Sequence, residues 1–96
     1  MAQDDLITIR LTTTGLPAKW MVTFSRRLVA DKLAANATIH QRPHPDSGTD
    51  VLVTLHTQQR HLPRISARAT CADTIATFPL ECDEAYRAWI LAVTAA

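Results

Sequence analysis

The chain has 96 residues, 47% of them hydrophobic and 20% charged, and a formal net charge of +1. A chain of this length and composition is typical of one globular domain, here residues 1–96. A charge so near zero gives no electrostatic reason to expect nucleic acid or an anionic membrane as a partner. No apolar run approaches the roughly 20 residues that span a membrane, and the acidic start lacks the layout of a signal peptide. Since two cysteines are too few for a disulfide framework, we expect a cytoplasmic protein.

Four segments have the pattern of β-strands. In the first, at residues 6–12, apolar residues alternate with polar ones from Ile7 to Leu11, which predicts one buried face. The other strands are expected at residues 37–41, 51–57 and 74–80. The turn-forming residues 42–50 predict that the second and third strands form a hairpin. Pro79 has no N–H to donate, which predicts an edge position for the fourth strand.

Three segments have apolar residues at helical spacing. The first helix is expected over residues 18–36, with Asn36 as its C-terminal stop. A weaker helix is expected over residues 58–70, with Pro63 in its first turn, where the missing N–H costs little. The last helix follows Asp83, which is a good N-cap residue.

The resulting order is strand, helix, strand, strand, helix, strand and a final helix. This is the split βαβ, or ferredoxin-like, arrangement (βαββαβ) of the α+β class, with a C-terminal extension. We expect an antiparallel sheet with helices on one face only. The other face, which carries Leu52, Thr54 and His56 at alternating positions, is expected to be covered by further copies of the chain.

Several stretches resemble, in order along nearly the whole chain, sequences of the CutA family of divalent-cation tolerance proteins. They are Leu11-Thr12-Thr13, Leu33-Ala34-Ala35-Asn36, His56-Thr57, the stretch from Thr74 to Pro79, and Tyr86-Arg87-Ala88-Trp89-Ile90. Asn36 stands where the family has a cysteine, and residues 42–50 make a shorter hairpin than the family's. The chain is therefore similar to a shortened and divergent member of that family.

The resemblance implies a PII/CutA-like fold and a homo-oligomer, most simply a homotrimer. It implies a non-catalytic function in tolerance or binding of divalent metal ions, copper in particular. The alternative that it implies is a PII-like regulatory module, which senses a small ligand or a partner protein at the clefts between subunits.

Strand parity suggests a candidate metal site. If Ile39 and Val53 face the helices, His40 and His56 face the other side, because side chains alternate along a strand. Residues on one face of a hairpin lie within about 4.5–8 Å when they are directly or diagonally opposite. His40 and His56 are therefore hypothesised to hold Cu²⁺ or another divalent cation. The alternative is that both pack with threonines in a subunit interface, since two ligands make a poor metal site.

Four residues are candidates for a cleft between subunits: Cys71, Asp73, Tyr86 and Trp89. Cys71 and Asp73 could bind a metal at such a cleft, although a turn and capping role explains them as well. Tyr86 and Trp89 could line a ligand pocket. The alternative for both, and for Trp20, is packing on the apolar side of a helix, which is the commoner role of aromatic residues at helical spacing.

The remaining polar residues are expected to be ordinary surface. His44 and His61 are expected to be exposed, and Arg60, Arg64 and Arg68 recur every four residues, as a basic stripe that is either a phosphate surface or a solvated helix face. The chain has only two glycines, so it has no glycine-rich phosphate loop, and it contains no CxxC or HExxH motif. We therefore do not expect an enzyme.

Overall fold

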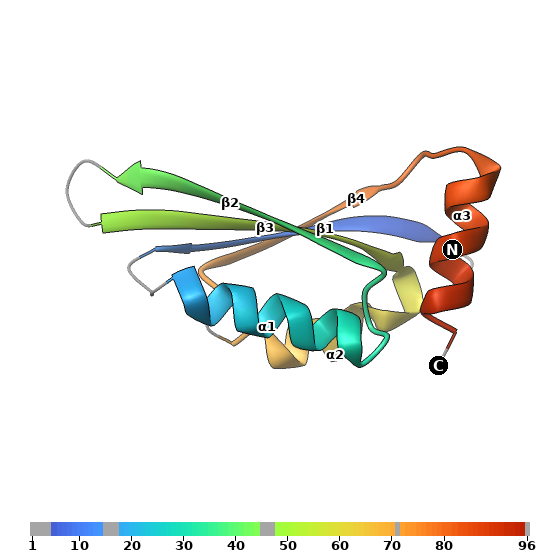
Figure 1. Ribbon diagram of the computed structural model, residues 1–96, viewed down its shortest axis with the longest axis horizontal. Coiled ribbons are helices and arrows are strands. Elements are labelled where there is room, and N and C mark those ends of the chain that lie inside the picture. Colours follow the sequence, from blue (N-terminus) through green and yellow to red (C-terminus); the bar gives the residue numbers. More distant parts are fainter. Residues whose placement is uncertain (1–4, 15–17, 45–47, 71, 96) are drawn as a thin grey trace.

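The computed structural model describes residues 5–14, 18–44, 48–70 and 72–95. They form four strands, three α-helices and one short 3-10 helix. In chain order these are β1 (Leu6–Thr14), α1 (Ala18–Ala30), β2 (Asn36–His44), β3 (Gly48–Gln58), η1 (Gln59–His61), α2 (Leu62–Arg68), β4 (Thr74–Pro79) and α3 (Glu84–Val93). This is the predicted order of a ferredoxin-like α+β fold with an added C-terminal helix (Figure 1).

The four strands form one antiparallel sheet in the order β2-β3-β1-β4. The predicted hairpin of β2 and β3 and the predicted edge position of β4 are therefore confirmed. Both hairpin strands are longer than expected: β2 continues to His44 and β3 begins at Gly48, so residues assigned to the turn continue the ladder as far as the pair His44 and Gly48.

The main core lies between the sheet and the two helices α1 and α2. Its strand residues occupy every second position of the two central strands, as the alternation predicts. The buried residues of this core include Ile7, Ile9, Leu11, Val51, Val53 and Leu55 from the strands and Met21, Leu28 and Ile65 from the helices. Figure 1 shows α1 and α2 under the same face of the sheet.

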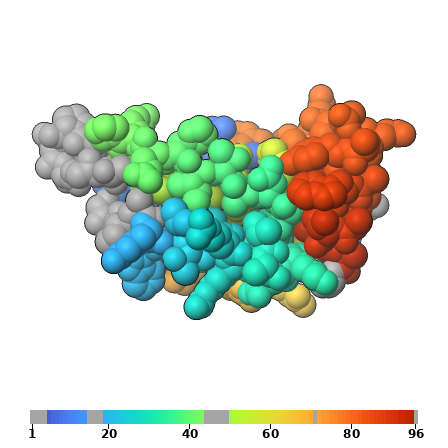
Figure 2. All heavy atoms as spheres, viewed as in Figure 1, coloured from blue at the N-terminus to red at the C-terminus, as the bar shows by residue number. Residues whose placement is uncertain are grey.

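The opposite side of the sheet, which we call the helix-free face, is not bare along its whole length. Leu6 belongs to this face and is buried together with Ala35 and Ile90 of α3. The helix α3 therefore packs over one end of the helix-free face, and Figure 2 shows its side chains gathered at one end of the molecule beside those of β2. The expectation that helices cover one face only is wrong for α3, because its apolar residues are buried against the far side of β1.

The end of α1 also differs from the prediction. The helix ends at Ala30, and Lys32 has a φ of 62°, in the left-handed region. The N–H of Leu33 donates to the carbonyl of Leu28 at 2.9 Å, and the N–H of Lys32 donates to the carbonyl of Val29 at 3.1 Å. These two hydrogen bonds form a Schellman motif, so Lys32, and not Asn36, is where the helix stops.

Two other predicted helix features are confirmed. Pro63 lies in the first turn of α2, and the Asp83 carboxylate accepts the N–H of Tyr86 at 2.8 Å as the N-cap of α3. The second helical segment is shorter than expected, because α2 ends at Arg68 and η1 precedes it. Among the described residues, no helix combines the length and the apolar character needed to cross a membrane.

The left-handed residue at the end of α1 gives a stability prediction. Replacing Lys32 by Gly removes the Cβ that disfavours positive φ, at a cost of some backbone freedom, so we expect the free energy of unfolding to rise by about 0.5 kcal/mol. The matched control is Ala30→Gly at the last residue of α1, where the backbone is helical. This change is expected to lower the free energy of unfolding by about 0.5–1 kcal/mol. Urea unfolding of the two variants measures both signs, and a destabilised Lys32→Gly would contradict this account of the helix end.

Candidate functional site

Four polar and aromatic side chains meet at the end of the helix-free face that α3 covers. Asn36 at the start of β2 lies directly opposite His56 near the end of β3. The Asp83 cap fixes the first turn of α3, which brings Tyr86 over this strand pair. Trp89 follows one turn later on the same side of the helix. We call these four residues, Asn36, His56, Tyr86 and Trp89, the His56–Tyr86 cluster.

The polar contacts of the cluster converge on the tyrosine hydroxyl. Asn36 Nδ2 donates to Tyr86 Oη at 3.3 Å, and His56 Nδ1 lies 2.7 Å from the same oxygen. A tyrosine hydroxyl has one proton and two lone pairs, so it can accept from Asn36 and still make a hydrogen bond with His56 Nδ1. The hydroxyl donates when Nδ1 carries no proton, and it accepts when Nδ1 is protonated.

Burial favours the neutral form of the imidazole. The half-buried position of His56 under α3 lowers the pKa of its imidazole below the ordinary 6.5, because the charged form loses solvation there. The lowered pKa therefore favours an uncharged His56 at neutral pH.

The aromatic part of the cluster extends from this buried contact to the surface. The rings of Tyr86 and His56 meet edge to face with centroids 5.8 Å apart, and those of Tyr86 and Trp89 stack at 5.6 Å with an angle of 22°. Trp89 remains 45% exposed. Packing against His56 and Trp89 therefore accounts for Tyr86. Trp89, in contrast, leaves a large part of its indole exposed at this end of the sheet.

The predicted pairing of His40 with His56 is not formed within the chain. In the observed register His40 lies opposite Leu52, and His56 lies opposite Asn36. Both imidazoles are on the helix-free face, as predicted, but they are four positions apart along the ladder, or about 13 Å at 3.3 Å per residue. Within a single chain the two imidazoles are thus too far apart to share one ion. Strand parity assigns a residue to a face but does not set its position along the ladder, which here is two positions beyond a diagonal neighbour. Among the described residues, no three His, Cys, Asp or Glu side chains come together as a metal site.

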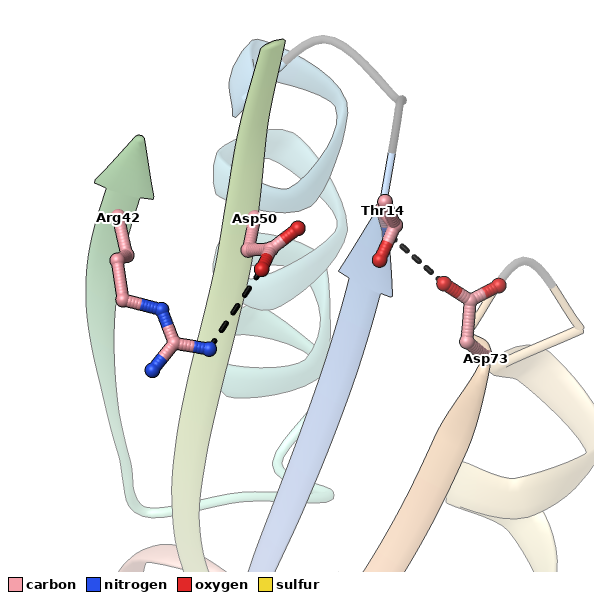
Figure 3. A network of polar contacts seen from close by, with 4 residues as sticks. All are labelled: Thr14, Arg42, Asp50 and Asp73. Atoms are coloured by element: carbon pink, nitrogen blue, oxygen red, sulfur yellow. Dashed lines mark hydrogen bonds and ion pairs between the residues drawn. The ribbon is translucent and has the colours of Figure 1, made fainter. Parts of the chain in front are cut away.

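The other cleft candidates lie elsewhere. Asp73 precedes β4 at the far end of β1, where its carboxylate accepts the N–H of Thr14 at 2.8 Å and its own N–H donates to the Thr12 carbonyl at 2.7 Å (Figure 3). It is therefore a turn residue, at the opposite end of the sheet from Tyr86. Cys71 lies outside the described residues, and Cys82 is an exposed free thiol.

An ion pair links the two hairpin strands near the end of the sheet where Asp73 lies. Arg42 on β2 and Asp50 on β3 are register partners, and their side chains lie 3.5 Å apart, as Figure 3 shows. Since the Arg42 side chain is largely exposed, this pair contributes at most about 1 kcal/mol to stability.

Two expectations about burial are corrected, one in each direction. His61 is buried, with Nε2 2.7 Å from the carbonyl oxygen of Thr94, so it fixes the end of α3 to the turn after β3. Trp20, expected on the apolar side of α1, is 62% exposed. The side chain of His44 lies outside the described residues.

The basic stripe is not one surface. Arg60 Nη2 donates to the Thr94 carbonyl at 3.1 Å, whereas Arg68 pairs at 2.5 Å with Asp31, the residue after α1. The sequence carried no signal for these contacts, because they depend on where the last helix and α1 lie.

Comparison with solved structures identifies the architecture. The CutA1 protein of Ehrlichia chaffeensis superimposes with a TM-score of 0.76 at 16% identity, covering 99% of this chain and 100% of that one. The chain has the CutA fold. The periplasmic divalent cation tolerance protein CutA of Archaeoglobus fulgidus gives a TM-score of 0.75 at 17% identity, with 93% and 98% coverage. CutA of Synechococcus elongatus, solved in complex with a Bis-Tris molecule, gives 0.72 at 16%, with 97% of each chain covered.

Comparisons with protein-family models and with curated proteins find no match to this sequence. The CutA resemblance that the sequence motifs predicted is thus confirmed by the superpositions. With sequence identities of only 16–17%, what they establish is the fold.

The histidine of the cluster predicts a pH dependence of stability. Since burial lowers the folded-state pKa of His56 below 6.5, the unfolded chain takes up this proton first as the pH falls. The stabilisation is complete above pH 6.5 and is lost as the pH falls from there through the folded-state pKa. Within this window one such proton changes the free energy of unfolding by at most about 1.4 kcal/mol per pH unit.

The measurement is urea unfolding of the wild type and of His56→Gln between about pH 7.5 and 5, a range that brackets the ordinary histidine pKa. We expect the glutamine variant to lose part of the wild-type pH dependence. His40→Gln is the matched control, because it removes an exposed imidazole from the same face and leaves the contact between His56 and Tyr86 intact. Parallel profiles for the wild type and His56→Gln would contradict the assignment.

Proposed function

We propose that this chain is a member of the CutA family: a non-catalytic, cytoplasmic homotrimer that contributes to divalent-cation tolerance by binding copper or a similar ion where its subunits meet. The observation that carries the proposal is the agreement of the fold with CutA structures over nearly the whole length of both chains. The proposal is also supported by the CutA-like motif of the last helix, which contains Tyr86, Trp89 and Ile90. In the structure these residues pack over one end of the helix-free face or stack beside it.

Self-association is supported by the exposed part of the helix-free face. Phe78 on the edge strand β4 is 44% exposed. The guanidinium carbon of Arg10 lies over its ring, 5.2 Å from the ring centroid. Trp89 adds a second exposed aromatic at the end that α3 covers. Exposed apolar surface next to an open strand edge is typical of a contact between subunits.

Cation binding between subunits is supported by the positions of the histidines. His40 is exposed on the edge strand β2, so its imidazole is accessible to a ligand set completed by another chain. In the tautomer whose Nδ1–H donates to Tyr86 Oη, the Nε2 lone pair of His56 is free for a cation. Imidazole nitrogen is a good ligand for Cu²⁺.

A second candidate function is a PII-like effector module that binds a small ligand or a partner protein at a cleft between subunits. The observation that favours it is the stacked pair of Tyr86 and Trp89, whose exposed ring offers a flat apolar wall. The complex of Synechococcus CutA with Bis-Tris indicates that a small organic molecule binds to that protein.

The assembly is tested by light scattering. A trimer of chains of 10.6 kDa has a mass of about 32 kDa. Phe78→Lys places a second cation beside Arg10 on the helix-free face, so we expect its mass to fall toward that of one chain. Trp20→Lys, an equally drastic change at an exposed aromatic on α1, is expected to leave the mass unchanged. A wild-type mass near 10.6 kDa at working concentration would overturn the trimer.

The cation is tested by calorimetric titration with Cu²⁺ and by the melting temperature, since a ligand that binds only the folded state raises it. We expect His40→Ala to weaken Cu²⁺ binding by about tenfold or more, as changes around metal ligands do. Thr38→Ala, an exposed neighbour on the same face of β2, is the control and should bind like the wild type. Equal Cu²⁺ affinities of the wild type and His40→Ala would rule out His40 as a ligand. A higher melting temperature with small organic ligands, but not with metals, would favour the effector module.

A further inference from the structure

The layer of helices contains a groove that the His56–Tyr86 cluster does not use. It lies between α1, along its residues 19–27, and the end of α2. Figure 1 shows these two helices under the same face of the sheet. Its volume is about 500 Å³, within the range of about 300–1,000 Å³ that is typical of small-molecule sites. Beside the groove, Arg68 of α2 pairs with Asp31, the residue after α1.

The charge of the groove has one sign. Lys19 and Arg27 of α1 and Arg68 of α2 line it, and among the described lining residues there is no carboxylate. Asp31 lines the adjoining hollow of about 360 Å³ and neutralises Arg68 in part. Three cations thus converge here in a chain whose net charge is only +1, so the local charge is complementary to an anion.

An aromatic row runs beside the cations. Trp20 and Phe24 are four residues apart on α1 and therefore adjacent on the helix surface, as are Lys19, Thr23 and Arg27 in the neighbouring row. Phe24 packs against the main core, whereas Trp20 is 62% exposed. The groove accordingly has an exposed indole plane next to a cluster of charged donors.

We propose that this α1–α2 groove binds a small aromatic phosphate of mononucleotide size, with its ring stacked on Trp20 and its phosphate bound by Lys19, Arg27 and Arg68. A bare anion would leave the indole unused, and an apolar ligand would leave the cations uncompensated. Guanidinium groups form paired, charge-assisted hydrogen bonds with phosphate, and every nucleobase offers a face for stacking on an aromatic side chain. A nucleic-acid strand is disfavoured, because three cations on a nearly neutral protein neutralise too few phosphates.

The groove is separate from the surfaces used in the proposed function. The His56–Tyr86 cluster and Phe78 lie on the helix-free face, whereas the groove lies among the helices on the other side of the sheet. Binding here therefore requires neither the trimer nor the cation, and its failure would leave both intact.

The test is calorimetric titration of the wild-type protein with adenosine 5′-monophosphate, inorganic phosphate and adenosine at low salt, where screening is weakest. We expect the nucleotide to bind more tightly than either of its parts. In nitrogen-15 NMR spectra the indole N–H signal of Trp20 should shift on titration and that of Trp89 should not.

Matched variants separate the two halves of the site. Lys19→Gln/Arg27→Gln should weaken nucleotide binding by about tenfold or more, and Arg64→Gln, an exposed cation of α2 outside the groove, should leave it unchanged. Trp20→Leu should weaken nucleotide binding by about fivefold or more and leave phosphate binding unchanged, whereas Trp89→Leu should change neither.

Several outcomes would overturn the proposal: no binding of the nucleotide, equal affinity for nucleotide and phosphate, a shift of Trp89 in place of Trp20, or equal losses in the double variant and in Arg64→Gln. Binding of an acidic peptide in the groove without binding of the nucleotide would overturn it in favour of a protein partner.

Discussion

The antiparallel pair of central strands, β1 and β3, is the constraint on which the other elements depend. Because side chains alternate along both strands, the register that sets Ile9 opposite Leu55 places one apolar row under α1 and α2 and sends the intervening residues to the other face. A shift of one position would bury threonines and expose the core. The same register fixes which end of the sheet receives α3, since Leu6 and Gln58 are partners at that end.

The last helix gives the second face of the sheet a partial cover of its own. Its apolar residue Ile90 is buried with Leu6, and its C-terminal end is held by polar contacts: Gln58 Nε2 donates to Thr94 Oγ1 at 2.9 Å, and His61 lies 2.7 Å from the Thr94 carbonyl. Buried polar groups of this kind are costly when unpaired, so they specify where the helix lies. With α3 fixed, Tyr86 meets His56 and Trp89 stays 45% exposed.

The candidate site was predictable only in its parts. Tyr86 and Trp89 stand out in the sequence as a motif at helical spacing, and strand parity correctly assigned His40 and His56 to one face. Their separation along that face depends on the hairpin register, which is fixed by strands that continue into residues dense in turn formers. The pairing of His56 with Tyr86 joins residues 30 positions apart, and no local pattern indicates it. Similarly, the burial of His61 follows from where Thr94 lies, not from its own neighbours in the chain.

The sequence by itself determined the order of the elements, the buried face of each central strand, the edge position of β4 and the Asp83 cap, because alternation, proline chemistry and capping are local properties of the chain. The tertiary structure decided the end of α1, the face that α3 covers, the distance between the two histidines and the groove between α1 and α2. Each of these depends on contacts between segments far apart in the sequence, whose packing overrides local preference: Lys32 accepts a left-handed backbone because Leu33 is then buried against Leu28.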